Sequence, residues 1–157
     1  MPEGGLPMAL ATPLLQKDIQ NSPTDSSNLL NSPVSKGFGT HLLVEMWHAP
    51  FSSLADAESV SSILQYTVSH LQMDSMEETR VNTFQFDPYG VSATATSSVL
   101  HILMHTWPEK GYAAVDIFAR NQADAFNALE RIKFKLNPKD LHVMELARGQ
   151  LLNMEDT

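Results

Sequence analysis

Apolar positions along the chain follow two different periods from about residue 38 onward. Residues 40–48, THLLVEMWH, form a short apolar run rich in β-formers and predict a first strand. After the break at Pro50, apolar residues recur every three or four positions and predict an amphipathic helix over 53–73. Ser52 or Ser53 is the expected N-cap of this helix, because a serine hydroxyl can accept a hydrogen bond from a free backbone N–H.

The second half of the chain returns to strand-like patterns, with one further helix. The expected strands cover residues 81–86, 92–98, 101–106, 112–119 and 141–146. Between the last two strands, apolar residues at helical spacing predict a helix that is capped by Asn121 or Asp124 and ends at Pro138.

This order of elements predicts an α+β two-layer sandwich, in which helices cover one face of a mostly antiparallel sheet. The other face of the sheet needs a cover, and in a chain this short a second copy can supply it. We therefore expect a homodimer that forms through the sheet layer or its edge.

The chain divides into three parts by composition. Residues 1–37 are rich in proline, serine and asparagine and contain no aromatic residue, which predicts a disordered tail. Residues 38–152 are expected to form one domain, and residues 153–157 a frayed C-terminus.

Composition narrows the class of function. The formal net charge of −8 argues against a nucleic acid or an anionic membrane as the main partner. No apolar run is long enough for a membrane span, and the N-terminus lacks a basic signal region, so a cytoplasmic protein is expected. The chain has no cysteine, which excludes a disulfide framework and a cysteine nucleophile.

Residues 90–118 contain most of the candidate chemistry. His101 and His105 lie four positions apart, and Trp107 and Glu109 follow at once. The histidines lack a third ligand at a suitable spacing, so no metal site is expected.

Several motifs together resemble the bacterial and archaeal S-adenosylmethionine decarboxylases. They are Phe86-Asp87-Pro88-Tyr89-Gly90-Val91-Ser92, His101, His105-Thr106-Trp107-Pro108-Glu109, Gly111-Tyr112-Ala113-Ala114-Val115-Asp116 and Phe118. Gly39-Thr40-His41-Leu42-Leu43 and His142-Val143-Met144-Glu145 with Arg148-Gly149 are similar to the family's first and last strands. The resemblance spans about residues 38–152.

The resemblance implies a pyruvoyl-dependent enzyme of spermidine synthesis. In that family a serine attacks the preceding peptide carbonyl, the chain is cut, and the serine becomes a pyruvoyl group. The pyruvoyl carbonyl then forms a Schiff base with the substrate amine and accepts electrons as CO2 leaves. The family's sheets dimerise, and both protomers contribute near each site.

This sequence departs from the family where that chemistry resides. Val99 and Leu100 stand at the family's cleavage pair of glutamate and serine, and Arg120 stands at its catalytic cysteine. Leucine has no oxygen to attack a carbonyl, and arginine is a poor proton donor because it stays protonated. We therefore expect no pyruvoyl cofactor and no decarboxylation.

The residues that match the family's supporting positions are retained. Ser92 and His105 match residues that assist self-cleavage, Phe86 matches the aromatic that stacks on adenine, and Glu109 matches the carboxylate that holds the ribose. The candidate ligand-binding residues are therefore Phe86, Trp107, Glu109 and Arg120. The expected ligand is a nucleoside such as S-adenosylmethionine or methylthioadenosine.

Other interpretations remain open at this point. The chain could catalyse a changed, pyruvoyl-independent reaction, with Arg120 binding a substrate carboxylate. It could retain some decarboxylase activity through cleavage at a shifted serine, Ser97 or Ser98. It could also be a regulatory partner of an active paralogue in a heteromer, or a structural dimer with a collapsed pocket.

Overall fold

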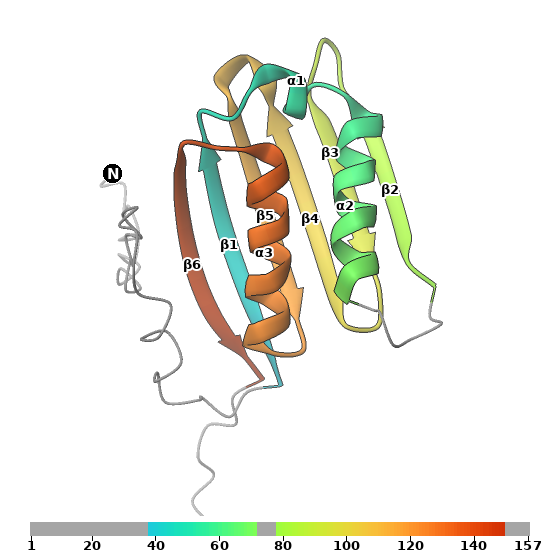
Figure 1. Cartoon of the computed structure of the whole chain (residues 1–157), viewed down its shortest axis with the longest axis vertical. Coiled ribbons are helices and arrows are strands. Elements are labelled where there is room, and N and C mark those ends of the chain that lie inside the picture. Colours follow the sequence, from blue (N-terminus) through green and yellow to red (C-terminus); the bar gives the residue numbers. More distant parts are fainter. Residues whose placement is uncertain (1–37, 72–77, 150–157) are drawn as a thin grey trace, which may run out of the picture.

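The computed structural model describes residues 38–71 and 78–149, so the expectations for residues 1–37 and 153–157 lie outside the described residues. Six antiparallel strands form one sheet in the order β2-β3-β4-β5-β1-β6 (Figure 1). The strands are β1 (Gly39–Trp47), β2 (Arg80–Gln85), β3 (Val91–Thr96), β4 (Leu100–Trp107), β5 (Tyr112–Ala119) and β6 (Asp140–Arg148).

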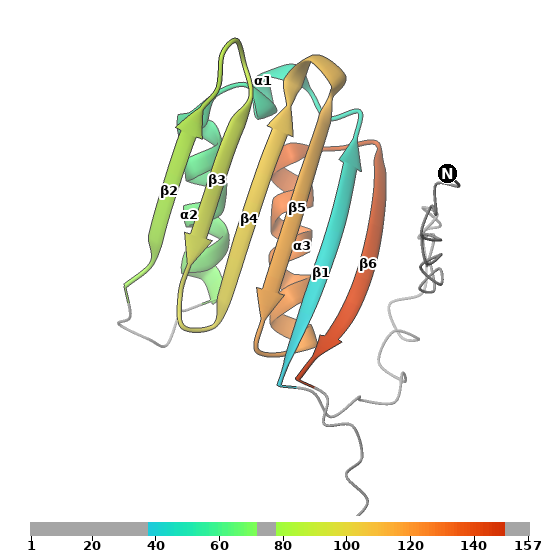
Figure 2. The ribbon, with the colours of Figure 1, turned by 180° about the vertical axis from the view of Figure 1, so that it is seen from behind.

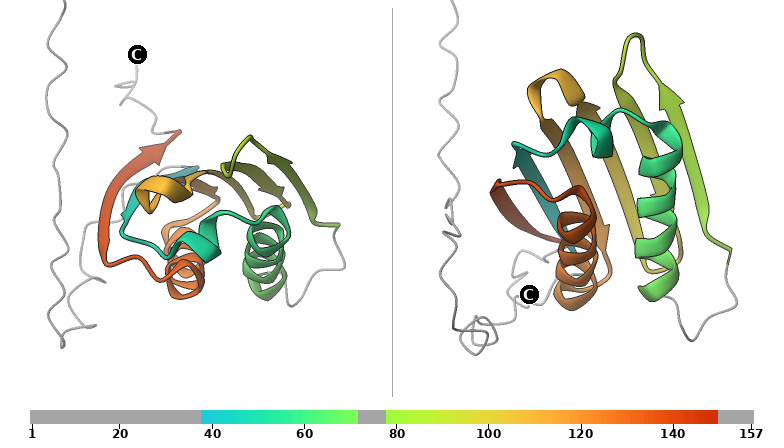
Figure 3. Two further views of the ribbon diagram at one scale, coloured as in Figure 1. Left: turned by 90° about the horizontal axis from the view of Figure 1, so that it is seen from above. Right: turned by 45° about the horizontal axis from the view of Figure 1, so that its top comes forward.

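Two long helices, α2 (Ala57–Leu71) and α3 (Gln122–Leu136), lie side by side on one face of the sheet. The view from above in Figure 3 shows a helix layer and a sheet layer, and Figure 2 shows the opposite sheet face without a helix. The expected α+β two-layer sandwich is therefore confirmed. None of the described helices is long and apolar enough to cross a membrane.

The alternation of side chains along β4 explains how the layers hold together. Leu100, Ile102 and Met104 point to the helix layer and are buried, whereas His101 and His105 point to the face without helices. The same alternation in β1, β3 and β5 gives a continuous apolar core between sheet and helices. The face without helices is called the open face below. It is lined by the alternate side chains of each strand, those that point away from the helices.

The first helical segment differs from the prediction. A single helix over 53–73 is wrong at its start, because a short helix α1 (Phe51–Leu54) ends before α2 begins at Ala57. The Asp56 carboxylate accepts a hydrogen bond from the Ser59 backbone N–H at 2.8 Å, so it competes with helix continuation. Hydrogen bonds from Ser59 also lower the pKa of Asp56.

The predicted serine N-cap is also wrong. Ser53 lies inside α1, and its hydroxyl donates a hydrogen bond to the Pro50 carbonyl at 2.8 Å instead of accepting one from a helix N–H. The predicted residues 72 and 73 of the helix lie outside the described residues.

The boundaries of α3 follow the prediction closely. Asn121 is its N-cap, and the Asn121 side chain accepts a hydrogen bond from the Asp124 backbone N–H at 2.8 Å. The helix ends at Leu136, and its C-cap Asn137 adopts a left-handed conformation with φ of 51°. Of the two predicted capping residues, Asn121 therefore fills the position, and Asp124 lies in the first turn.

Candidate functional site

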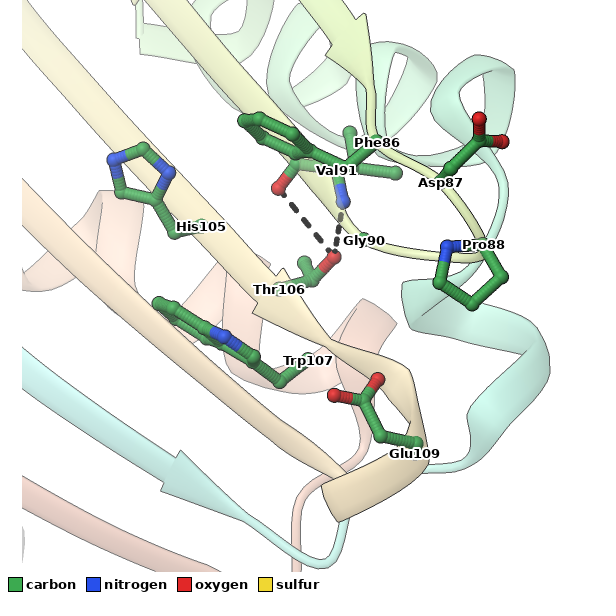
Figure 4. Close-up of a pocket in the computed structure, with 9 residues that line it drawn as sticks. All are labelled: Phe86, Asp87, Pro88, Gly90, Val91, His105, Thr106, Trp107 and Glu109. Atoms are coloured by element: carbon green, nitrogen blue, oxygen red, sulfur yellow. Dashed lines mark hydrogen bonds between the residues drawn. The ribbon is translucent and has the colours of Figure 1, made fainter.

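A cavity of about 390 Å³ opens where the β2–β3 loop approaches the end of β4 (Figure 4). It is lined by Phe86, Asp87, Pro88, Gly90, Val91, His105, Thr106, Trp107 and Glu109. Loop 86–90 forms one wall, and the end of β4 with the 3-10 helix η2 (Pro108–Lys110) forms the other. Residues that lie about twenty positions apart in sequence therefore share this site.

The shape of loop 86–90 depends on close backbone contacts. The Phe86 N–H donates a hydrogen bond to the Gly90 carbonyl at 2.6 Å, which closes the loop. A Cβ atom at Gly90 would lie 3.1 Å from the Thr106 carbonyl oxygen, so glycine permits the loop to approach β4 this closely.

Thr106 fixes the back of the cavity. Its hydroxyl accepts a hydrogen bond from the Val91 N–H at 2.9 Å and donates one to the Leu54 carbonyl at 2.8 Å. The buried hydroxyl thus connects the cavity strands to α1. Thr106 lies inside the motif of residues 105–109 but was not predicted as a site residue.

Aromatic rings form the walls of the cavity. Figure 4 shows the rings of Phe86, His105 and Trp107 around one hollow, with Phe86 and Trp107 still 47% and 39% exposed. Trp107 stacks on Tyr112 at 5.2 Å between ring centroids, and Tyr112 stacks on Trp47 at 4.3 Å. The Trp107 indole is therefore supported from behind and presents an open side to the cavity.

The two carboxylates of the site have different positions. Glu109 lies in η2 beside Trp107, whereas the Asp87 carboxylate points away from the rings (Figure 4). Glu109 is thus the carboxylate that can reach a molecule stacked between the rings.

Ser92 and His105 are directly opposite each other on β3 and β4. Both side chains are on the open face, and opposite Cβ atoms in an antiparallel pair are about 5 Å apart. The fold therefore brings together the two residues that the sequence resemblance assigned to a common task.

Val99, Leu100 and Arg120 lie at the other end of the sheet. The Arg120 N–H donates a hydrogen bond to the Val99 carbonyl at 3.2 Å, and the Arg120 side chain pairs with Asp124 at 2.9 Å. Trp107 lies seven positions after Leu100 on an extended strand, which is about 23 Å along β4. Within one chain, the structure thus groups Phe86, Trp107 and Glu109 but places Arg120 far from them.

Residues 97–100, which include the pair predicted to match the family's cleavage site, form a closed turn. The Ser97 hydroxyl oxygen accepts hydrogen bonds from the backbone N–H groups of Val99 and Leu100, both at 3.3 Å. The Leu100 side chain is 3% exposed and packs in the core between sheet and helices.

His101 and His105 do not form a common site. They project from the same face of β4, but four residues of extended strand place them about 13 Å apart. The His101 Nδ1 atom instead lies 2.9 Å from the Thr96 hydroxyl. Across the described parts of the chain, no group of three histidine or acidic side chains lies close enough to hold a metal ion.

The fold and the cavity together define a class of protein: an α+β two-layer domain with an aromatic cavity and a carboxylate at its rim. A family model described as S-adenosylmethionine decarboxylase matches residues 40–149. The chain belongs to the S-adenosylmethionine decarboxylase family.

Individual relatives agree with this assignment. The chain is 33% identical over 115 residues to an S-adenosylmethionine decarboxylase proenzyme of Methanococcus maripaludis, which covers 73% of this chain and 92% of the relative. It is 33% identical over 117 residues to the proenzyme of Thermotoga petrophila, with 73% and 87% covered. The crystal structure of the Aquifex aeolicus adenosylmethionine decarboxylase superposes with a TM-score of 0.67 at 26% identity, covering 78% of this chain and 99% of that one.

Proposed function

We propose that this chain is a nucleoside-binding member of its family that neither cleaves itself nor decarboxylates S-adenosylmethionine. The observation that carries the proposal is the contrast between the two ends of β4. A formed aromatic cavity lies at the Trp107 end, whereas the position of the family's precursor serine at the other end is a buried leucine.

The pyruvoyl group implied by the family does not fit the residues of this chain. Leu100 offers no oxygen for attack on the Val99 carbonyl, and its side chain packs in the core. Arg120, at the position of the family's cysteine, is ion-paired with Asp124. We therefore derive no reaction step through a pyruvoyl group and expect the chain to remain intact.

The cavity suits an uncharged or cationic nucleoside. The faces of Phe86 and Trp107 can stack a purine base, and the Glu109 carboxylate can accept hydrogen bonds from ribose hydroxyls. None of the described residues that line the cavity is a lysine or an arginine, which disfavours nucleotide phosphates. The proposed ligands are S-adenosylmethionine and methylthioadenosine. The proposed role of the protein is in polyamine metabolism, in the cytoplasm.

The open face supports the proposal of a homodimer. Met144, Leu43, Asp116 and Leu103 follow one another in one row across the sheet, so the centre of the open face has three apolar side chains around one carboxylate. Arg148, hydrogen-bonded to His41 at 3.1 Å, lies toward one end of this face, and Glu45 lies toward the other.

An antiparallel second copy would pair the unlike charges at the two ends of the open face. It would also bring its Arg120 end toward the cavity of the first chain. A heteromer with an active paralogue could form through the same surface. Measurement of self-association distinguishes it from the homodimer.

Intact mass and calorimetry test the proposal together. We expect a single chain of 17.4 kDa after purification, and saturable binding of methylthioadenosine and S-adenosylmethionine. Two fragments would contradict the absence of self-cleavage and would favour a cut at Ser97 or Ser98. An intact chain that binds neither nucleoside would contradict nucleoside binding and favour a structural dimer. Release of CO2 from S-adenosylmethionine by the intact chain would show a changed reaction.

A further inference from the structure

Gln85, the last residue of β2, connects three separate segments through its side-chain amide. Its Oε1 atom accepts a hydrogen bond from the Ala57 N–H at 3.1 Å. Its Nε2 atom has two hydrogens and lies within hydrogen-bond distance of three carbonyl oxygens, those of Ala55 at 3.2 Å, Tyr89 at 3.0 Å and Gly90 at 3.1 Å, so one hydrogen is shared. One side chain therefore uses both its donor and its acceptor groups on backbone atoms.

These partners belong to functionally different parts of the fold. Ala57 is the first residue of α2, and Ala55 is the C-cap of α1, so both belong to the junction between these helices. Tyr89 and Gly90 belong to loop 86–90, and the adjacent Phe86 is one of the cavity's aromatic walls. Gln85 thus joins the cavity loop to the helix junction behind it.

Two further contacts join the same parts. The Phe51 ring of α1 packs edge-on against the Tyr89 ring, with 5.2 Å between centroids. Thr106, from the opposite wall of the cavity, donates its hydrogen bond to the Leu54 carbonyl. The α1–α2 junction is therefore held by both walls of the cavity, and Gln85 makes the connection on the loop side.

We propose that Gln85 is a positioning residue for the cavity, which sets the place of loop 86–90 and of the Phe86 ring by anchoring the loop to the α1–α2 junction. The proposal rests on the proposed nucleoside site. Its chemistry requires a side-chain amide, because a carboxylate cannot donate to the three carbonyls and a thioether can make neither set of bonds. Gln85 itself is exposed, so the expected effect is on loop geometry more than on global stability.

Hydrogen–deuterium exchange tests the anchoring without any ligand. In the full chain, Gln85→Met should increase the exchange rate at the Ala57 and Phe86 amides at least about fivefold, while amides of β1 and β5 stay unchanged. Gln85→Glu should increase it at Phe86 alone, because a carboxylate still accepts the hydrogen bond of the Ala57 N–H. Gln65→Met is the matched control, because Gln65 lies on α2 and its side chain donates to Ser69. Equal exchange in the wild type and both Gln85 variants would overturn the proposal, and so would an equal increase throughout the sheet.

Calorimetry with methylthioadenosine tests the consequence for the cavity. We expect the Kd to rise about tenfold in both Gln85 variants and to stay unchanged in Gln65→Met. An unchanged Kd in the Gln85 variants would overturn the positioning role while leaving the nucleoside site intact. A wild-type chain that binds no nucleoside would contradict the proposed function instead, and the exchange measurement would still decide whether Gln85 anchors the loop.

Discussion

The hydroxyl group of Tyr112 donates a hydrogen bond to the Glu45 carboxylate, from β5 to β1 across the open face. Burial of the phenol, together with this hydrogen bond and the charge of Glu45, raises the pKa of Tyr112 to about 12. Because the same ring stacks on Trp107, the contact fixes one wall of the cavity. A residue outside the cavity thus contributes to its shape.

The raised pKa of Tyr112 gives stability a defined pH dependence. The folded state holds the phenol proton more tightly than the unfolded state, whose tyrosine pKa is about 10. The stabilisation is therefore fully present below pH of about 10 and is lost as the pH rises toward 12. We expect Glu45→Gln to shift the ultraviolet absorbance titration of tyrosine to lower pH. A titration identical to that of the wild type would contradict the role of Glu45.

Phe86 should contribute to ligand affinity through stacking. Phe86→Ala removes one ring wall of the cavity, and loss of base stacking costs about 1–3 kcal/mol, so the Kd for methylthioadenosine should rise about 5- to 150-fold. Phe134→Ala is the matched control, because Phe134 is 79% exposed on α3 and lies outside the cavity. Equal affinities of the two variants in calorimetry would place the nucleoside elsewhere.

Leu100 should be required for stability. Leu100→Ser creates a small cavity and buries a hydroxyl, and we expect a loss of about 3 kcal/mol in the free energy of unfolding. Leu100→Met, which conserves volume, should cost less than about 1.5 kcal/mol. Urea denaturation measures both values. Equal stability of Leu100→Ser and the wild type would show that this position is not part of the packed core.

The open face should mediate self-association. Met144→Arg places a charge next to Leu43 in the central row of the open face and should convert a dimer to a monomer in sedimentation experiments. Phe134→Arg, on the helix layer, is the control and should leave the dimer intact. A wild-type monomer at micromolar concentration would contradict the homodimer, and association of the open face with a paralogue would then be the next measurement.

Asn121 and Arg120 should differ in their effect on stability although they are neighbours. Asn121→Ala removes the N-cap of α3 and should lower the free energy of unfolding by about 1 kcal/mol. Arg120→Ala removes an exposed ion pair with Asp124 and should cost less than about 0.5 kcal/mol. A larger loss for Arg120→Ala in thermal denaturation would show a structural role for this side chain.

The strands and α3 were predictable because their signals are local. The alternation of His101, Ile102 and Leu103 specifies which side of β4 faces the helices, and Asn121 caps the helix that follows β5. The junction of α1 and α2 was not predictable in the same way. The apolar spacing continues through Ala55 and Asp56, and contacts with Gln85 and Thr106 from distant strands help to define the break.

The sequence alone determined the family, because motifs such as residues 105–109 need no coordinates. It also predicts that Leu100 and Arg120 replace two of the family's catalytic residues. Only the tertiary structure decided which of these residues meet. Phe86 and Glu109 come together because antiparallel pairing folds the β2–β3 loop onto the end of β4. Arg120 stays remote from them, because an extended strand carries its two ends about 23 Å apart.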